Sequence, residues 1–331
     1  MSPPANSITD SRAASPPAPA SDIVCATLDG GLPMIIAHRG AGGYRPEHTL
    51  DAYVLAAGQG AEVIEPDIVA SRDGVLYARH DLGLARSTDV ATRAEFARRA
   101  RVIAGQRDWW IADFDADEVD TLRAIQPFPG RSIAFDGHFV VPRLGQVLDL
   151  ARELGAQRGT PLIVDIEIKQ PDYFGALGID VLDILCRELG AHGASGATAP
   201  VWLECFDHTF LRNASQRLGN SCFALVENMP EEIAVRDASL HAMAAWARGV
   251  APAKHLLWDR AGNDNGFVDA AHALGLQVHA WTFRDDRPPA PFATAHAELF
   301  AAFALGVDAL FCDFPDTAVA SRAEFTAANA G

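Results

Sequence analysis

The sequence predicts an α/β fold in which parallel strands alternate with helices and close into a TIM (β/α)8 barrel. Short apolar runs alternate with amphipathic segments along most of the 331 residues, a pattern that is typical of successive βα units. The chain has neither an internal repeat nor a Pro/Gly-rich linker near its middle. Because a barrel of about 250 residues with insertions accommodates this length, we predict a single domain over residues 23–331.

Nine apolar runs qualify as strands, which is one more than an eight-stranded barrel requires. In chain order they are Met34–Ala37, Val63–Ile68, Val75–Ala78, Leu162–Ile168, Val201–Cys205, Cys222–Val226, Leu256–Trp258, Val278–Trp281 and Ala309–Cys312. One of them is therefore expected to be a hairpin partner or to lie outside the sheet, and Leu256–Trp258 is the weakest of the nine.

Amphipathic helices are predicted between most of these runs, because apolar residues recur there about every three to four positions. The examples are Leu50–Ala57, Gly145–Leu154, Ile179–Leu189, Phe210–Leu218, Phe267–Leu274 and Ala295–Leu305. Glycine is favoured at helix C-termini, and we expect Gly58, Gly155, Gly190, Gly219, Gly275 and Gly306 to end them.

Two regions depart from this alternation. Residues 1–22 are rich in Pro, Ala and Ser and are predicted to form a disordered tail. The stretch from about 91 to 142 contains Trp109, Trp110 and a short helix predicted around Asp117–Ile125. We interpret it as an insertion after the early strands, and such insertions usually lie at the catalytic mouth of a barrel.

The charge balance excludes some partners. Lys and Arg number 27 against 43 Asp and Glu, which gives a formal net charge of −16. We therefore expect no binding to nucleic acid or to an anionic bilayer through the overall field of the protein. The sequence contains no run of eighteen apolar residues, so no membrane span is predicted. Since no secretory signal is seen, the expected compartment is the cytoplasm, or the periplasm or exterior if the true N-terminus is missing.

Carboxylates gather where two of the predicted strands end. Glu65 and Asp67 lie two residues apart and share one face of their strand, as do Glu167 and Lys169 on theirs. A hard cation, Ca²⁺ or Mg²⁺, held by Glu65, Asp67 and Glu167 would offset the cost of burying them. Internal ion pairing, for instance of Glu65 with Arg39, is an equal alternative from the residues alone.

Two histidines stand at the ends of different predicted strands, His38 after the first and His80 after the third. Two imidazoles in one cavity suit a general acid and a general base, and their position beside three carboxylates weakens the alternative of purely structural roles. An anionic substrate of so acidic a chain needs local positive charge, which Arg39 and Lys169 would supply to a phosphate.

Four ordered segments resemble the glycerophosphodiester phosphodiesterase family: HRGAGGYRPEHT at 38–49, IEPD at 64–67, SRDGVLYARHD at 71–81 and IEIK at 166–169. They are similar to the family's His-Arg-Gly, Pro-Glu-Asn-Thr, Glu-x-Asp, Asp-Gly with His-Asp, and Glu-x-Lys motifs. The segments AWTFRDD and GVDALFCDFPDTA look like the family's last two strands. The resemblance covers about residues 32–322 and is greatest to the longer, periplasmic-type members.

The resemblance implies a TIM-barrel hydrolase that cleaves glycerophosphodiesters, small-molecule substrates, to sn-glycerol 3-phosphate and an alcohol such as choline or ethanolamine. The family pattern implies metal ligands at Glu65, Asp67 and Glu167 and an acid/base pair at His38 and His80. It also implies phosphate contacts at Arg39 and Lys169 and an aromatic glycerol contact at Trp281. The nucleophile is water or, as in the family's proposed route, the substrate's 2-hydroxyl, which would form a cyclic phosphate. The sequence does not decide which histidine is the acid.

Three positions depart from what the family or a regular strand would have. His48 stands where the family usually has Asn, and we favour a tolerated turn variant over a third imidazole near the site. Pro66 removes a ladder donor between Glu65 and Asp67 and predicts a strand end or a bulge. Cys205 lies where a polar residue is common, which puts one substrate contact in doubt.

Two other functions remain as alternatives. A related barrel phosphodiesterase of the sphingomyelinase D or phosphatidylinositol phospholipase C kind would need an exposed apolar rim. Trp109, Trp110, Ile111 and Phe114 would form one unless they pack on the barrel. A non-catalytic barrel that binds phosphorylated ligands would lack a ligand or a histidine, and none is missing here. The sequence predicts no oligomeric state.

Overall fold

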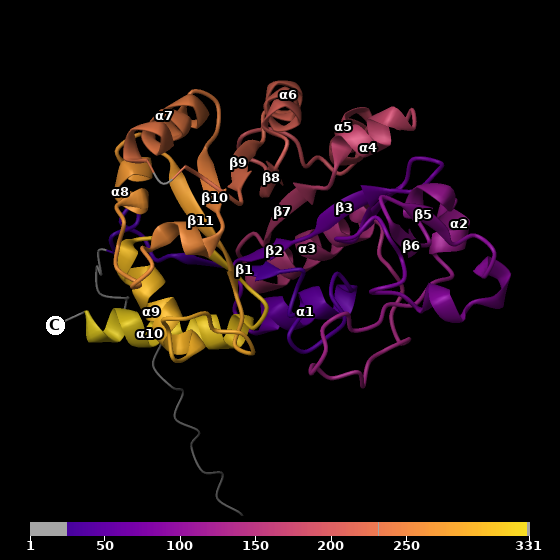
Figure 1. Cartoon of the computed structure of the whole chain (residues 1–331), viewed down its shortest axis with the longest axis horizontal. Coiled ribbons are helices and arrows are strands. Elements are labelled where there is room, and N and C mark those ends of the chain that lie inside the picture. The colour runs from indigo at the N-terminus through magenta and orange to yellow at the C-terminus, as the bar shows by residue number, and fades with distance from the viewer. Residues whose placement is uncertain (1–24, 231, 330–331) are drawn as a thin grey trace, which may run out of the picture.

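The computed structural model describes residues 25–230 and 232–329, so the predicted tail at 1–22 lies outside the described residues. Within this part of the chain, the main sheet runs β2-β1-β12-β11-β10-β9-β8-β7-β3-β4, and β7 also pairs with β2. That pairing closes eight parallel strand positions into a barrel with helices around it (Figure 1), which confirms the predicted TIM-barrel fold.

The barrel strands are short and almost entirely buried. They are β1 (Met34–His38), β2 (Val63–Glu65) continued by β3 (Asp67–Ala70), β7 (Ile163–Ile168), β8 (Val201–Cys205), β9 (Ser221–Val226), β10 (Gly249–Pro252), β11 (Gln277–Phe283) and β12 (Ala309–Cys312). The break between β2 and β3 falls at Pro66, the strand interruption that its missing N–H predicts.

Two of the nine strand predictions need comment. The run at Val75–Ala78 forms β4 (Leu76–Ala78), which pairs antiparallel with β3 and is a hairpin partner outside the barrel, a role that the sequence predicted for one of the nine runs without assigning it to this one. The prediction at Leu256–Trp258 was wrong, because Lys254–Leu257 forms a 3-10 turn, η4. The missing barrel strand is β10, whose sequence Gly-Val-Ala-Pro has a single β-branched residue and carries no strand signal of its own.

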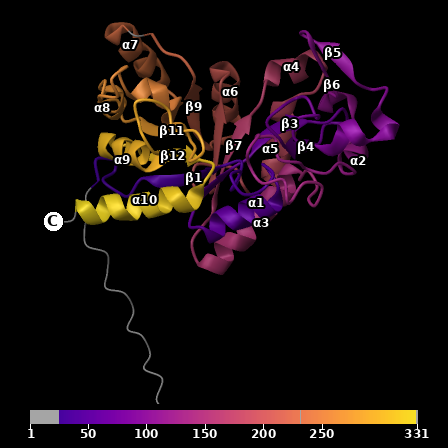
Figure 2. The same cartoon turned by 60° about the horizontal axis from the view of Figure 1, so that its bottom comes forward.

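The helices lie outside the barrel. They are α1 (Leu50–Gly58), α3 (Leu144–Arg158), α4 (Pro171–Ala176), α5 (Val181–Ala191), α6 (His208–Leu218), α7 (Ile233–Ala244), α8 (Phe267–His272), α9 (Ala295–Leu305) and α10 (Pro315–Ala328). Figures 1 and 2 both show α9 and α10 side by side. Gly219 and Gly306 are left-handed C-caps as predicted, whereas α3 continues past Gly155 and is capped by Gly159.

The segment between β4 and α3 folds from short pieces. They are η1 (Asp89–Thr92), η2 (Ala94–Phe96), the β5 (Arg101–Ile103) and β6 (Gln106–Asp108) hairpin, η3 (Ile111–Asp113) and α2 (Ala116–Val119). The helix predicted around Asp117–Ile125 is thus only one turn long.

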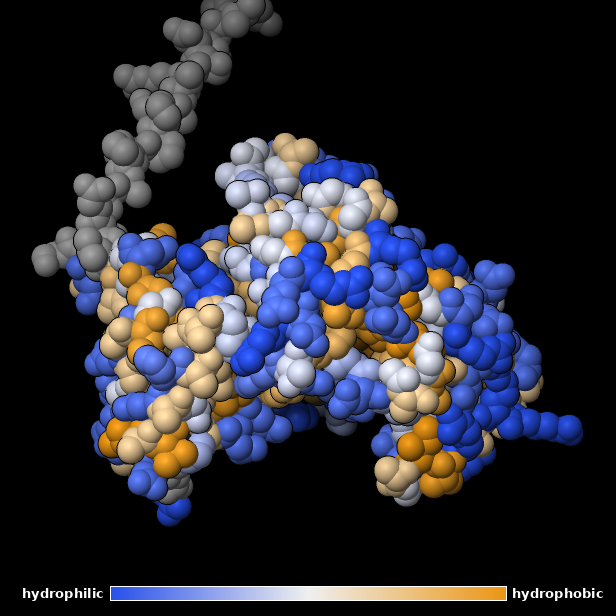
Figure 3. All heavy atoms as spheres, turned by 90° about the horizontal axis from the view of Figure 1, so that it is seen from above, coloured by the Kyte–Doolittle hydropathy of each residue, from blue (hydrophilic) through white to orange (hydrophobic). Residues whose placement is uncertain are grey.

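The residues of this segment that were candidates for an apolar rim pack inward. Trp110, Ile111 and Phe114 are buried, and the indole N–H of Trp109 donates to the Phe96 carbonyl at 2.6 Å. On the face shown in Figure 3, apolar residues form separate patches between hydrophilic ones. None of the helices in the described ranges combines the length and apolar character that a bilayer span requires.

Side chains fill the barrel interior below the strand ends. Ile36, Phe223, Leu225, Ala251 and Phe311 form this inner core, so the barrel is packed and not an open pore. Polar side chains that project from the strand ends therefore meet above an apolar floor, in a setting where each buried charge needs a partner.

Gly249 tests how tightly the barrel is packed. A Cβ at this position would lie 2.5 Å from the Gln277 carbonyl oxygen and 2.7 Å from the Phe223 ring. We expect Gly249→Ala to lower the free energy of unfolding by about 1–3 kcal/mol, measured by urea denaturation. The control is Gly190→Ala in α5, where nothing lies within 4 Å and a gain of about 0.5–1 kcal/mol is expected. Equal stability of both variants would contradict this packing.

Candidate active site

A cavity of about 1270 Å³ opens at the carboxyl ends of the barrel strands. Its lining includes most of the residues that the sequence singled out: His38, Arg39, Glu65, His80, Glu167, Lys169 and Trp281. Asp67 lies directly behind this wall, in register with Glu167 on the neighbouring strand. The structure thus brings all eight predicted site residues to one end of the barrel.

Three buried carboxylates form the centre of the site. One oxygen from each of Glu65, Asp67 and Glu167 lies within 4.8 Å of the others. Burial and repulsion from Asp67 and Glu167 raise the pKa of Glu65 well above its usual value. Burial also raises the pKa of Glu167 to about 8, although Lys169 opposes the shift. The three carboxylates therefore cannot all be ionised without additional positive charge.

Two cationic side chains supply part of that charge. Lys169 Nζ lies 2.5 Å from Glu167 Oε1, and Arg39 Nε lies 3.2 Å from Asp67 Oδ2. Burial opposes ionisation of Asp67, but Lys169 and Arg39 outweigh it and hold the pKa of Asp67 well below its usual range. Arg39 is itself held by Glu47, whose Oε2 accepts from Nη1 at 2.9 Å.

The ion pairs and a cation site are compatible, because one oxygen of Asp67 receives no hydrogen bond from any described residue and lies 3.5 Å from Lys169 Nζ. This oxygen, Oδ1, is buried. All donors in the trio are carboxylate oxygens, the ligands that Ca²⁺ and Mg²⁺ prefer. The residues present therefore fit a hard divalent cation between Glu65, Asp67 and Glu167.

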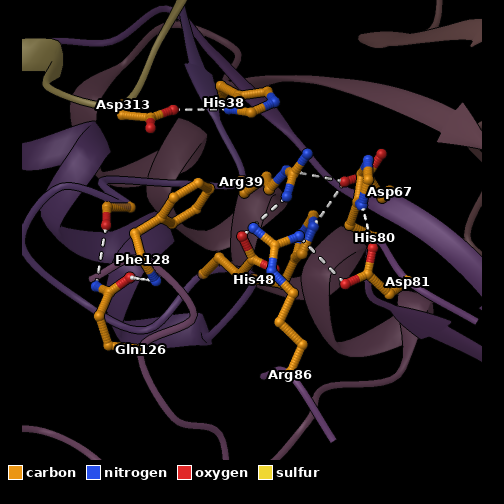
Figure 4. A network of polar contacts seen from close by, with 12 residues as sticks. His38, Arg39, His48, Asp67, His80, Asp81, Arg86, Gln126, Phe128 and Asp313 are labelled. Atoms are coloured by element: carbon orange, nitrogen blue, oxygen red, sulfur yellow. Dashed lines mark hydrogen bonds and ion pairs between the residues drawn. The ribbon is translucent and has the colours of Figure 1, made fainter. Parts of the chain in front are cut away.

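His38 is oriented by a carboxylate that the sequence reasoning did not single out. His38 Nδ1 lies 2.7 Å from Asp313 Oδ1, as Figure 4 shows. The second oxygen of Asp313 accepts from Arg131 at 2.5 Å and from Arg284 at 2.9 Å. The position of Asp313 directly after a strand could have identified it. Ala37 and Cys312 are the last residues paired between β1 and β12, so His38 and Asp313, which follow them, are neighbours.

This contact defines the protonation of His38. Burial, with a further contribution from Arg39, lowers the pKa of His38 to about 4, and Asp313 only partly opposes the shift. Asp313 is ionised, because the hydrogen bond from His38 and the charges of Arg284 and Arg131 outweigh its burial and lower its pKa. A carboxylate can only accept, so Nδ1 carries the proton and Nε2 is the acceptor in the cavity.

His80 has its own aspartate. Its Nδ1 lies 2.6 Å from Asp81 Oδ1, and Arg86 lies 3.3 Å from the other oxygen of Asp81. These contacts are drawn in Figure 4. His80 is more exposed than His38, and it lines the same cavity. Two histidines, each oriented by an aspartate, thus face one space.

His48 lies beside the three carboxylates, as a third imidazole near the site, which is the alternative that the sequence favoured less. Its backbone takes the left-handed conformation of a turn, with φ of 61°. Its ring is also a third imidazole: Nε2 lies 2.8 Å from Asp67 Oδ2 and Nδ1 lies 2.9 Å from the Tyr53 hydroxyl. Burial lowers its pKa.

The outer residues of the site differ in how they face the cavity. The Trp281 indole N–H donates to the Ala251 carbonyl at 2.7 Å, and its ring meets Phe206 edge-on at 5.8 Å. Cys205 is buried, and its thiol points at the Ile168 carbonyl at 3.1 Å, so Phe206 is the residue of this loop that borders the cavity. Glu204, which the sequence reasoning passed over, is buried at the cavity wall with Oε2 unpartnered by the described residues.

The chain is similar to known proteins over most of its length. A model of the glycerophosphoryl diester phosphodiesterase family matches residues 38–317. The chain is 29% identical over 323 residues to a glycerophosphodiester phosphodiesterase of Arabidopsis thaliana, across 85% of this chain and 84% of the relative. It is 26% identical over 328 residues to one of Haemophilus influenzae, across 86% and 88% of the two chains.

Solved structures share the fold. A crystal structure from Silicibacter pomeroyi is similar with a TM-score of 0.70 and 21% identity, over 91% of this chain and 98% of that one. An Oleispira antarctica phosphodiesterase, solved with its product sn-glycerol-3-phosphate, is similar with a TM-score of 0.64 and 20% identity, over 89% and 98%.

The raised pKa of Glu167 predicts that cation binding depends on pH. Below about pH 8 this group carries a proton in the cation-free protein, and a cation must displace it. Affinity for Ca²⁺ or Mg²⁺ should therefore rise between about pH 6 and about pH 8, by up to about tenfold per pH unit. Isothermal titration calorimetry in buffers of different ionisation enthalpy measures both the affinity and the protons released.

A Glu167→Gln variant is the control for this titration. The amide carries no negative charge, so the variant should bind the cation more weakly than the wild-type protein. It also has no proton to displace, so it should release fewer protons on binding. An affinity that is flat across this range, with no proton release, would contradict the assignment.

Proposed function

The chain belongs to the glycerophosphoryl diester phosphodiesterase family, and we propose that it hydrolyses glycerophosphodiesters to sn-glycerol 3-phosphate and an alcohol. The observation that carries this proposal is the convergence of two aspartate-oriented histidines, three carboxylates and two cations in one cavity. The named relatives from Arabidopsis thaliana and Haemophilus influenzae are glycerophosphodiester phosphodiesterases, which supports the same substrate class.

Arg39 and Lys169 bind the phosphodiester in this proposal. Both side chains border the cavity, and both are held by carboxylates, so their positions are set before the substrate enters. A Ca²⁺ or Mg²⁺ ion at Glu65, Asp67 and Glu167, when bound, offsets negative charge that develops on the phosphate oxygens. Together with such an ion, the two buried side chains would give this acidic chain a local positive site for an anion.

His38 acts as the general base. Its Nδ1 donates to Asp313 and its Nε2 is free to accept, and its lowered pKa keeps the ring neutral near pH 7. It takes the proton of the nucleophile, which is water or the substrate's own 2-hydroxyl. In the second route a cyclic phosphate forms and water opens it, because an intramolecular attack has a high effective concentration.

His80, in its doubly protonated imidazolium form, supplies the proton that the leaving alcohol needs. Asp81 accepts from Nδ1–H, so the proton on the other ring nitrogen is the one that passes to the leaving oxygen and leaves His80 neutral. Trp281 and Phe206 form an aromatic wall beside these groups, against which the glycerol carbons pack. A phospholipase-like function lacks the same support, because the candidate rim residues Trp110, Ile111 and Phe114 are buried.

Hydrolysis of glycerophosphocholine, coupled to detection of glycerol 3-phosphate, tests the proposed reaction. We expect release that stops with EDTA and returns with Ca²⁺ or Mg²⁺, and a fall of about 10²- to 10⁴-fold in kcat for His38→Ala. The matched control is His272→Ala. His272 Nε2 lies 2.9 Å from Asp308 Oδ2, and neither residue lines the cavity. A folded, metal-loaded protein that is inactive on every glycerophosphodiester would refute the proposal.

The role of Asp313 gives a separate prediction. Asp313→Asn removes the charge that fixes the Nδ1–H tautomer of His38, so kcat should fall at least about tenfold with little change in KM. Asp316→Asn, at an exposed contact with Tyr44, should leave both constants near wild type. Wild-type kcat in Asp313→Asn would exclude this positioning role.

A further inference from the structure

His48 occupies an unusual place for a turn residue. Only 3% of it is exposed, and it takes a left-handed φ of 61°, which few non-glycine residues adopt. Its backbone N–H donates to the Arg39 carbonyl at 2.9 Å. The turn therefore fixes the direction in which the imidazole leaves the backbone, and that direction is toward Asp67.

The chemistry of its two neighbours sets the direction of both ring hydrogen bonds. The Asp67 carboxylate can only accept, so His48 Nε2 donates to Oδ2 across 2.8 Å. A neutral imidazole has one N–H, so Nδ1 accepts from the Tyr53 hydroxyl across 2.9 Å. Tyr53 is fully buried in α1. The ring is thus locked in one tautomer between two fixed groups, and Figure 4 shows its contact with Asp67.

The two oxygens of Asp67 have different surroundings as a result. Oδ2 has His48 at 2.8 Å and Arg39 Nε at 3.2 Å. Oδ1 is buried, receives no hydrogen bond from the described residues, and has Lys169 Nζ at 3.5 Å. A carboxylate held through one oxygen cannot rotate freely, so the other oxygen keeps a fixed position beside Glu65 and Glu167.

We propose that His48 is a positioning residue of the cation site, which anchors Asp67 Oδ2 and thereby presents Oδ1 as the ligand. The inference rests on the proposed function in one respect, that a divalent cation binds at Glu65, Asp67 and Glu167. The turn itself needs only a residue that tolerates the left-handed backbone. The proposed role belongs to the imidazole ring of His48.

Two substitutions at one position separate the ring from the backbone. Neither alanine nor glutamine shares the preference of Asn, Asp and His for the left-handed conformation, but only glutamine offers an N–H donor near the place of Nε2. The measurement is titration of the metal-free protein with Ca²⁺ alone by isothermal calorimetry, repeated with Mg²⁺. We expect His48→Ala to weaken binding about 10- to 100-fold, as loss of an outer partner of a metal ligand does, and His48→Gln to recover much of that loss.

Tyr53→Phe provides a second variant that leaves His48 in place. It removes only the hydroxyl that fixes the tautomer, and we expect about fivefold weaker cation binding, the equivalent of one hydrogen bond. If His48→Ala does not fold, this variant decides the question. His272→Ala is the control, since it breaks a similar histidine–aspartate pair elsewhere and should bind Ca²⁺ as the wild-type protein does.

The outcomes distinguish this inference from the proposed function. Equal Ca²⁺ affinity in the wild-type protein, His48→Ala and Tyr53→Phe would overturn the positioning role and leave the cation site intact. Equal losses in His48→Ala and His48→Gln would also overturn it, because the backbone would then be the cause. A wild-type protein that binds neither Ca²⁺ nor Mg²⁺ would overturn the proposed cation site, and this role with it.

Discussion

The burial of three carboxylates at one end of the barrel is the constraint on which the rest of the site depends. Glu65, Asp67 and Glu167 stand above an apolar floor, where an unpaired charge would cost several kcal/mol. Burial also raises the pKa of Asp165 to about 8, and that of Glu204 well above its usual range, within the same barrel. Arg39 and Lys169 relieve part of this cost, and the remaining excess of carboxylates explains why a divalent cation suits the centre.

The same arrangement recurs around the edge of the site. Each of three histidines contacts an aspartate, in the pairs His38–Asp313, His80–Asp81 and His48–Asp67, and each aspartate also contacts an arginine. An aspartate that is held by an arginine stays ionised and accepts a hydrogen bond from one defined ring nitrogen. The chain therefore orients its imidazoles by ion pairs behind them, which leaves the cavity side of His38 and His80 to the substrate.

The sequence predicted what depends on local pattern and missed what depends on long-range contact. Seven of the eight barrel strand positions follow from apolar runs, and the two-residue spacings of Glu65 with Asp67 and of Glu167 with Lys169 pointed to the buried carboxylates. Strand β10 could not be predicted, because Gly-Val-Ala-Pro owes its conformation to its neighbours in the barrel. The partners of Asp313, which are His38, Arg131 and Arg284, lie 275, 182 and 29 residues away along the chain, separations that no periodicity encodes.

The direction in which the aromatic side chains between β4 and α3 point could not be predicted from the sequence either. These side chains suited either an exposed rim or internal packing, since hydrophobicity alone does not give the direction of a side chain. The direction is set by tertiary contacts. Arg131 reaches from this segment to Asp313 and to the Gly42 carbonyl, and Gln126 donates to the same carbonyl at 3.2 Å. These contacts tie the segment to the loop after β1, which begins with Arg39. A segment held in this way contributes to the site through the carboxylate that orients His38, and its apolar residues are free to pack against the barrel.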